Sequence, residues 1–99
     1  MTQDERLMYG RAMHVIDYKV IGRPHIITEP SFEILRAMGL AIRALEKQEK
    51  AMERNFSRHI AILNYHLSNP TAMLFKDRYT IDAMTAGINA IKWLMGADK

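Results

Sequence analysis

The sequence predicts a mainly α-helical protein. We expect a long helix that packs against an antiparallel C-terminal helix, as in a helical hairpin or small bundle, preceded by a short β-like element. Two apolar stripes with steps of mostly three and four residues, over 35–67 and 81–95, predict the helices. With 99 residues, the chain is long enough for one domain, so residues 1–99 are taken as a single domain.

The N-terminal part is expected to contain an arm and the β-like element. Residues 1–10, MTQDERLMYG, are polar and predict a flexible arm; they contain no apolar region typical of a secretory signal. Ile16, Tyr18 and Val20 alternate with polar residues, which predicts a strand within a β-like element over 13–28. A turn at 22–24 would let residues 25–28 return as a second short strand.

The long helix is predicted over 29–67. Thr28 can cap it, with Glu29 and Pro30 in the first turn. A straight helix of ~37 residues would be about 55 Å long, whereas a compact 100-residue domain has a radius of gyration of only ~13 Å. We therefore expect a bend near Gly39 or Asn55, or else an elongated hairpin. The residues expected in the core are Leu35, Ile42, Leu63, Ile88 and Ile91.

The stretch LSNP should end the long helix. Asn69 can cap a short helix over 70–78 with Pro70 at its first position, Thr80 can cap the C-terminal helix over 80–95, and Gly96 can end it. This stretch is either a simple helix–helix connection or an exposed corner that a partner binds, with Ser68 as part of it. An X-Pro bond that is not locked populates both isomers, so a prolyl isomerase acting on Asn69–Pro70 is a candidate partner.

The sequence predicts no catalytic residues, cofactor or metal site. It contains no cysteine, and its five glycines are scattered, which excludes thiolate chemistry and a glycine-rich phosphate loop. His59 and His66 are seven positions apart, or about 10 Å along a helix, which is too far to share one zinc ion. They are expected to be polar members of a mostly apolar seam. The eight methionines fit either irregular core packing or an adaptable binding surface.

A basic strip is predicted on the long helix, opposite its apolar stripe. Its members are Arg36, Arg43, Lys47, Lys50, Arg54 and Arg58. They fall within about 80° of the helix circumference at 100° per residue. Three interpretations remain open: a solvated face, a docking strip for an acidic protein surface, or a phosphate-binding strip. The strip contains no aromatic residue on which a base could stack.

The whole chain resembles a family of phage proteins. The run HVIDYKVIGRPHIITEPSFEILRAMGL, with the helical remainder through INAIKWLMGADK, is similar in size, charge and order of elements to the anti-RecBCD accessory proteins of lambdoid Salmonella phages. The resemblance implies a non-enzymatic protein that binds the RecBCD helicase–nuclease of the host and modulates or inhibits it during phage recombination.

The predicted function is therefore a small interaction module for a large host complex, RecBCD being the suspected partner. The predicted partner-binding residues are the basic strip together with Ser68, Asn69 and Pro70. The alternative is a basic helical nucleic-acid-binding protein. The chain contains no apolar run of the ~20 residues needed to cross a bilayer, and a cytoplasmic location is expected, which is the host cytoplasm for a phage-encoded protein.

Overall fold

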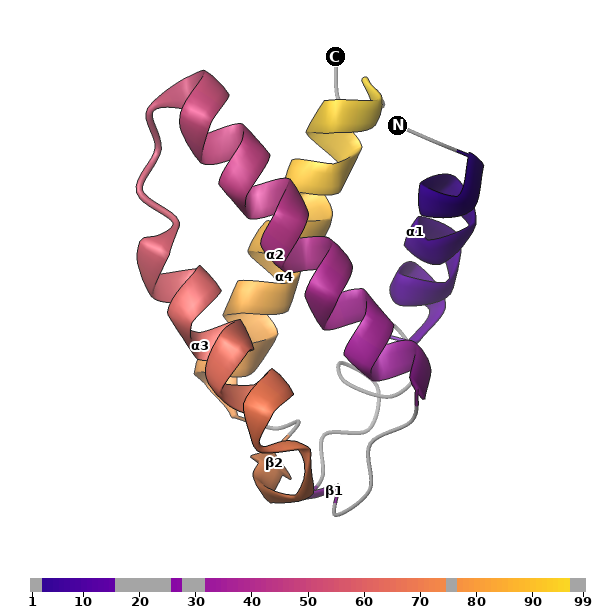
Figure 1. Ribbon diagram of the computed structural model, residues 1–99, viewed down its shortest axis with the longest axis vertical. Coiled ribbons are helices and arrows are strands. Elements are labelled where there is room, and N and C mark those ends of the chain that lie inside the picture. Colours follow the sequence, from indigo (N-terminus) through magenta and orange to yellow (C-terminus); the bar gives the residue numbers. More distant parts are fainter. Residues whose placement is uncertain (1–2, 16–25, 28–31, 75–76, 97–99) are drawn as a thin grey trace.

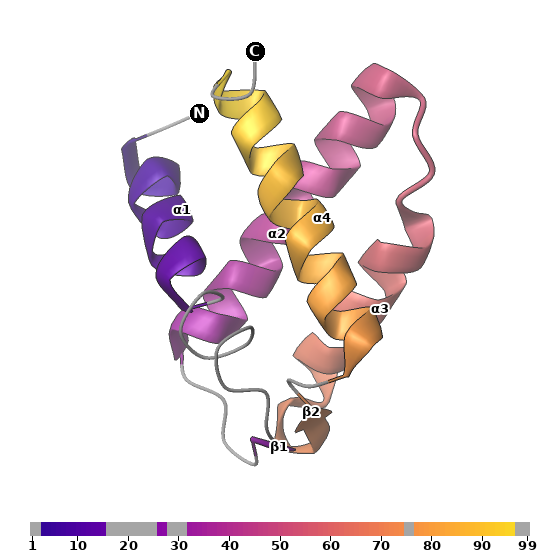
Figure 2. The same cartoon turned by 180° about the vertical axis from the view of Figure 1, so that it is seen from behind.

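The computed structural model describes residues 3–15, 26–27, 32–74 and 77–96, which form an all-α arrangement of four helices (Figure 1). The helices are α1 (Gln3–Val15), α2 (Phe32–Met52), α3 (Ser57–Ser68) and α4 (Arg78–Met95). In Figures 1 and 2, α1 and α3 run down the bundle while α2 and α4 run up it. The mainly α prediction is confirmed.

The core lies between the four helices and contains most of the predicted apolar stripe. Of the residues predicted to be buried, Ile42, Leu63, Ile88 and Ile91 are buried, and Leu35 is half-buried against the same cluster. The largest side chains that are fully buried come from α2, α3 and α4: Ile34, Met38, Leu45, Leu63, Met84 and Ile91. On α3 only Leu63 and His66 are buried, while Ile60, Ile62 and Leu67 are partly buried against the core.

Helices α2 and α4 cross near the middle of the bundle (Figures 1 and 2). At their close contact lie Gly87 and Ala41, which carry no large side chain. A Cβ atom added to Gly87 would lie 2.3 Å from the Cβ of Ala41 and 3.0 Å from its Cα. One turn to either side of this contact, both helices bury alanines: Ala37 and Ala44 on α2, Ala83 and Ala90 on α4. Gly87 is therefore required because any side chain would push the two helices apart.

The prediction of one helix over 29–67 is wrong, because the chain reverses between α2 and α3. Glu53 has a φ of 54°, the left-handed conformation that ends a helix. The backbone N–H of Phe56 donates to Glu49 Oε1 at 3.1 Å, and the N–H of Ser57 donates to Asn55 Oδ1 at 3.1 Å. These bonds satisfy N–H groups that the new helix leaves free. The break falls beside Asn55, one of the two positions expected to bend.

The reversal keeps the molecule short and changes the pairing of the helices. The radius of gyration is 12.6 Å and the longest extent 35 Å, well below the length of an unbroken helix. The C-terminal helix was expected to be antiparallel to one long helix. It is antiparallel to α3 but runs in the same general direction as α2 (Figure 1).

The predicted flexible arm is largely helical, since α1 begins at Gln3. Its buried residues are Ala12 and Val15, and Met8 is half-buried against the core. Met8, Ala12 and Val15 follow steps of four and three, which is a helical stripe, but a weak one because alanine buries little area. Acidic Asp4 and Glu5 in the first turn also favour a helix start.

The predicted β-like element over 13–28 is not found as expected. Residues 13–15 belong to α1, and residues 16–25 and 28 lie outside the described residues. Ile26–Ile27 forms strand β1, which pairs antiparallel with Met73–Leu74, strand β2, so that Ile26 lies opposite Leu74. Within the described residues, the partner of β1 is thus a segment more than 40 positions away in the sequence. Two residues per strand add no layer to the fold.

The prediction of a short helix over 70–78 is also wrong. Pro70–Ala72 forms a 3-10 helix, η2, which leads into β2, and residues 75–76 lie outside the described residues. Helix α4 is capped by Asp77, whose Oδ1 accepts from the N–H of Tyr79 at 2.8 Å, and Thr80 is buried within its first turn. The prediction that Gly96 ends this helix is confirmed by its left-handed conformation, with a φ of 75°.

Candidate functional site

All six residues of the basic strip are exposed, but they do not form one continuous line. Four of its members lie on α2, Arg54 follows in the connection to α3, and Arg58 lies on α3. The reversal of the chain takes Arg58 away from the others, and its guanidinium carbon lies 4.9 Å from the ring centre of Tyr79 on α4. The guanidinium of Arg36 lies 4.3 Å from the ring centre of Phe32.

What remains of the strip is a short basic face on the C-terminal half of α2. Arg43, Lys47 and Lys50 are exposed there, and none of them forms an ion pair with a carboxylate in the described part of the chain. We call these three residues the α2 basic face. An unpaired cation on a rigid helix is available to an acidic partner without first breaking an internal contact.

The Ser68–Pro70 corner lies at the other end of the bundle from the α2–α3 connection (Figure 1). Ser68 and Asn69 are exposed and Pro70 is partly buried. The prediction that Asn69 caps the following helix is wrong. It closes the preceding one, because its Nδ2 donates to the carbonyl oxygen of Tyr65 at 3.0 Å and its N–H also bonds to the end of α3. Pro70 begins η2, where its missing N–H is tolerated.

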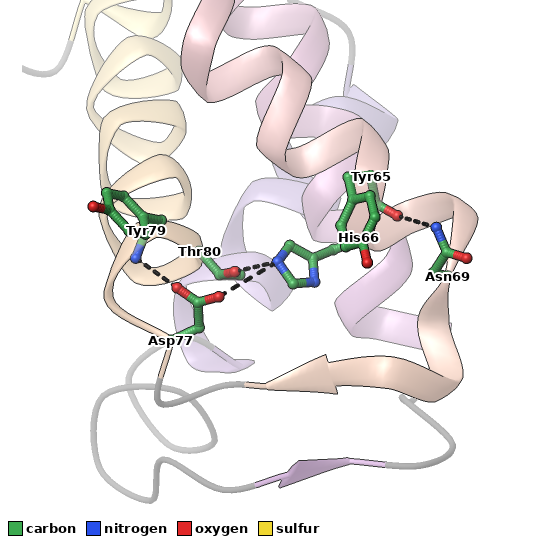
Figure 3. Close-up of polar contacts among 6 residues, drawn as sticks. All are labelled: Tyr65, His66, Asn69, Asp77, Tyr79 and Thr80. Atoms are coloured by element: carbon green, nitrogen blue, oxygen red, sulfur yellow. Dashed lines mark hydrogen bonds and ion pairs between the residues drawn. The ribbon is translucent and has the colours of Figure 1, made fainter.

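A buried polar cluster joins α3 to α4 next to this corner (Figure 3). The Thr80 hydroxyl and His66 Nε2 share a hydrogen bond of 2.7 Å, and Asp77 Oδ2 lies 3.9 Å from the same nitrogen. Thr80 is 0% exposed and His66 6%. His66 is thus the polar member of an apolar seam that the sequence indicated, and its partner is a side chain on the next helix.

This cluster has the residue types of a catalytic triad but not its geometry. A triad places the carboxylate on Nδ1 of the histidine and the nucleophile on Nε2, so that a proton passes across the ring. Here the carboxylate and the hydroxyl both approach Nε2, and Nδ1 has no hydrogen-bond partner among the described residues. The Thr80 hydroxyl also cannot be reached by a substrate. The cluster therefore serves the contact between α3 and α4.

The described residues contain no group of three histidine and acidic side chains placed to hold a metal ion. His59 is partly buried beside Phe56, with 6.1 Å between ring centres. It lies seven positions before His66, on nearly the same face of α3. None of the described helices is long and apolar enough to cross a membrane.

Sequence reasoning missed a cleft of about 500 Å³ at the end of the bundle that carries the α2–α3 connection. It is lined by Gln48, Met52, Arg54, Phe56, Asn89 and Trp93. Only Arg54 belongs to the predicted partner-binding set. One signal was available, because Gln48 lies on the apolar stripe, three positions after Leu45 and four before Met52. A polar residue at such a position is either buried and hydrogen-bonded or faces a site.

No protein-family model matches this sequence, and no curated protein or solved structure is similar to it at a significant level. The functional argument therefore rests on the residues and their arrangement.

Proposed function

We propose that this protein is a non-enzymatic interaction module that binds a larger DNA-processing enzyme in the host cytoplasm and modulates or inhibits it during phage recombination. A RecBCD-type helicase–nuclease is the first partner to test, because of the whole-chain resemblance to anti-RecBCD accessory proteins. The observation that carries the proposal is the α2 basic face, three exposed cations on one helix without ion-pair partners in the described residues.

A binding role fits the distribution of polar groups in the molecule. The buried polar cluster at His66 serves the contact between two helices, and Glu49 and Asn55 serve the α2–α3 connection. The exposed cations have no comparable internal role. Charges of this kind steer a partner into register and increase the association rate more than they add affinity.

The proposal is tested with purified RecBCD-type enzyme and the intact protein. We expect the wild type to bind the enzyme and alter its DNA-unwinding or nuclease rate. Replacing Arg43, Lys47 and Lys50 together by Gln should weaken binding and flatten its salt dependence. The melting temperature should change little, since exposed substitutions cost within about ±0.5 kcal/mol each.

A matched control removes three charges elsewhere. Arg6, Arg11 and Arg78 are exposed and lie on α1 and α4, so their joint replacement by Gln lowers the net charge equally. If both triple variants lose the same affinity, only net charge matters and the α2 basic face is not a docking site. Wild-type protein that neither binds nor affects the enzyme would remove the named partner.

The second candidate function is direct binding of nucleic acid, which the exposed cations also support. Against it, Glu46, Glu49 and Glu53 interleave with the cations Arg43, Lys47, Lys50 and Arg54, so the positive charge of this segment exceeds its negative charge by only one, which is little for a chain of phosphates. Tight binding to random duplex DNA, with an affinity that falls steeply as salt rises, would favour this alternative.

A further inference from the structure

The cleft beside Trp93 is formed by three segments that are distant in the sequence. The last two turns of α2 contribute Gln48 and Met52, the connection contributes Arg54 and Phe56, and α4 contributes Asn89 and Trp93. Its volume of about 500 Å³ falls within the range of ~300–1,000 Å³ typical of small-ligand sites. Such a volume holds one or two side chains with the backbone that joins them.

Gln48 supplies an amide that opens on the cleft and has no hydrogen-bond partner in the described residues. It is only 4% exposed, yet its side chain forms no hydrogen bond with another described residue. It also borders the cleft, so this is the direction from which a partner can reach its amide. A segment that covers this amide must replace its contacts with water by hydrogen bonds of its own, because an amide buried without them is unfavourable. Because it carries one donor group and one acceptor, it matches a peptide group.

The other side chains of the cleft divide into one cation and an apolar wall. Arg54 is exposed and forms no ion pair with a described carboxylate. Its guanidinium can bind a carboxylate through two parallel hydrogen bonds. Trp93 is 39% exposed and Met52 41%, which is high for large apolar side chains, and Phe56 adds a half-buried ring. An apolar side chain that entered here would remove this area from water.

We propose that the cleft binds a peptide segment of a partner protein that carries an apolar side chain next to a carboxylate. The apolar side chain packs on Trp93 and Met52, the carboxylate pairs with Arg54, and a peptide group completes the hydrogen bonds of Gln48. This inference rests on the proposed function, because it names the kind of segment that the interaction module recognises.

Charge favours a peptide over a nucleic acid in this cleft. Nucleic acids are held by several cations at once, whereas only Arg54 among the lining residues is charged. Glu49 lies at the edge of the site, since its Oε1 accepts from the N–H of Phe56, and exposed Glu53 precedes Arg54 in the chain. A single carboxylate can approach Arg54, but a chain of phosphates would also meet these two acids.

The experiment uses two blocked dipeptides that differ only in charge, acetyl-Leu-Glu-amide and acetyl-Leu-Gln-amide. Trp93 is the only tryptophan of the chain, so its indole N–H resonance and its fluorescence report directly on the cleft. With wild-type protein, we expect the glutamate peptide to shift the indole resonance in a saturable manner. The glutamine peptide should bind about tenfold more weakly, because it loses the charge-assisted hydrogen bonds.

Two single variants test whether Arg54 causes the preference for the glutamate peptide. Arg54→Gln should abolish the preference for the glutamate peptide, whereas Arg58→Gln, another exposed arginine outside the cleft, should retain it. No shift with either peptide, equal affinity for both, or a preference that survives Arg54→Gln would overturn the inference. A salt-dependent shift with oligo(dT) and none with the peptides would overturn it in favour of a nucleic-acid site.

The same variants separate this inference from the proposed function. If Arg54→Gln loses the peptide preference while the wild type fails to bind the RecBCD-type enzyme, the cleft stands and the named partner fails. If Arg54→Gln binds that enzyme as the wild type does and the peptides leave Trp93 unchanged, the interaction module stands and the cleft is not its recognition site.

Discussion

Helix α4 contacts its two main neighbours, α2 and α3, in different ways. Against α2, the contact is steric: Gly87 lies on Ala41 with no space for a Cβ, and both helices bury an alanine one turn to either side. Against α3, the close contact includes a hydrogen bond of 2.7 Å between His66 and Thr80, both buried. The first contact fixes how near two helices lie, and the second requires a particular chemical partner.

The difference shows how a small helical protein obtains one arrangement from few large side chains. Close packing of small residues excludes other arrangements of the two helices, because a single added carbon atom would overlap the neighbouring helix and push its backbone away. A buried polar pair excludes other arrangements through the cost of desolvation. Any shift that separates the two groups leaves a buried polar group without a hydrogen bond, which is unfavourable. Each contact can be broken separately.

The largest loss of stability is expected for Leu63→Ala. Leu63 is 0% exposed and is the one apolar side chain of α3 that is fully in the core. Its truncation should lower the free energy of unfolding by ~2–5 kcal/mol, measured by urea denaturation. Leu7→Ala on α1 is the control, because Leu7 is 61% exposed and its loss should cost less than about 0.5 kcal/mol. Equal effects in both variants would show that α3 does not contribute to the core as described.

The steric contact is tested by adding one carbon at each of two helical glycines. Gly87→Ala should destabilise by ~1–3 kcal/mol, because its Cβ would overlap Ala41. Gly39→Ala, inside α2, meets nothing within 4 Å and should stabilise by about 0.5–1 kcal/mol through helix propensity. Opposite signs in the two melting temperatures are the expected result. The same sign in both would contradict the close crossing of α2 and α4.

The polar contact is tested by two substitutions of Thr80. Thr80→Val keeps the shape but removes the hydroxyl, which leaves His66 Nε2 without its partner at 2.7 Å. We expect a loss of ~1–2 kcal/mol in thermal or urea unfolding. Thr80→Ser retains the hydroxyl and removes only a methyl group, so it should cost less. A serine variant less stable than the valine variant would mean that packing, and not the hydrogen bond, holds α3 to α4.

The smallest effect is expected for Pro70→Ala, at the corner that follows α3. Alanine tolerates the first position of a helical turn, and the lost constraint acts mainly on the unfolded chain, so stability should change by less than about 1 kcal/mol. Activity toward the partner enzyme should also survive if the corner is only a connection. A drop in activity at an unchanged melting temperature would instead identify it as a docking or isomerisation site.

The sequence predicts the elements with a strong apolar pattern and misses those that depend on distant contacts. Helices α2 and α4, much of the core and the role of Gly96 follow from spacing and local conformation. Helix α1 was mistaken for an arm because its stripe at Met8, Ala12 and Val15 is weak. The reversal at 53–56 could not be placed, since Glu53 adopts a left-handed conformation that its residue type disfavours and that no local pattern indicates.

The candidate site was predicted only in part, for a similar reason. Exposed cations are recognisable from helical spacing alone, and all six members of the basic strip are exposed. Helical spacing could not reveal that Arg58 lies away from the other members of the strip, because its position depends on the reversal of the chain between α2 and α3. It also could not bring Trp93 to Gln48, which lies 45 positions earlier in the chain.

The close approach of Gly87 to Ala41 also bears on the order in which the molecule folds. These residues lie 46 positions apart, whereas His66 and Thr80 lie 14 apart. Closing the longer loop costs about 1 kcal/mol more in chain entropy. We therefore expect α3 and α4 to associate early and α2 to dock late, so that weakening the glycine contact accelerates unfolding and leaves the refolding rate nearly unchanged.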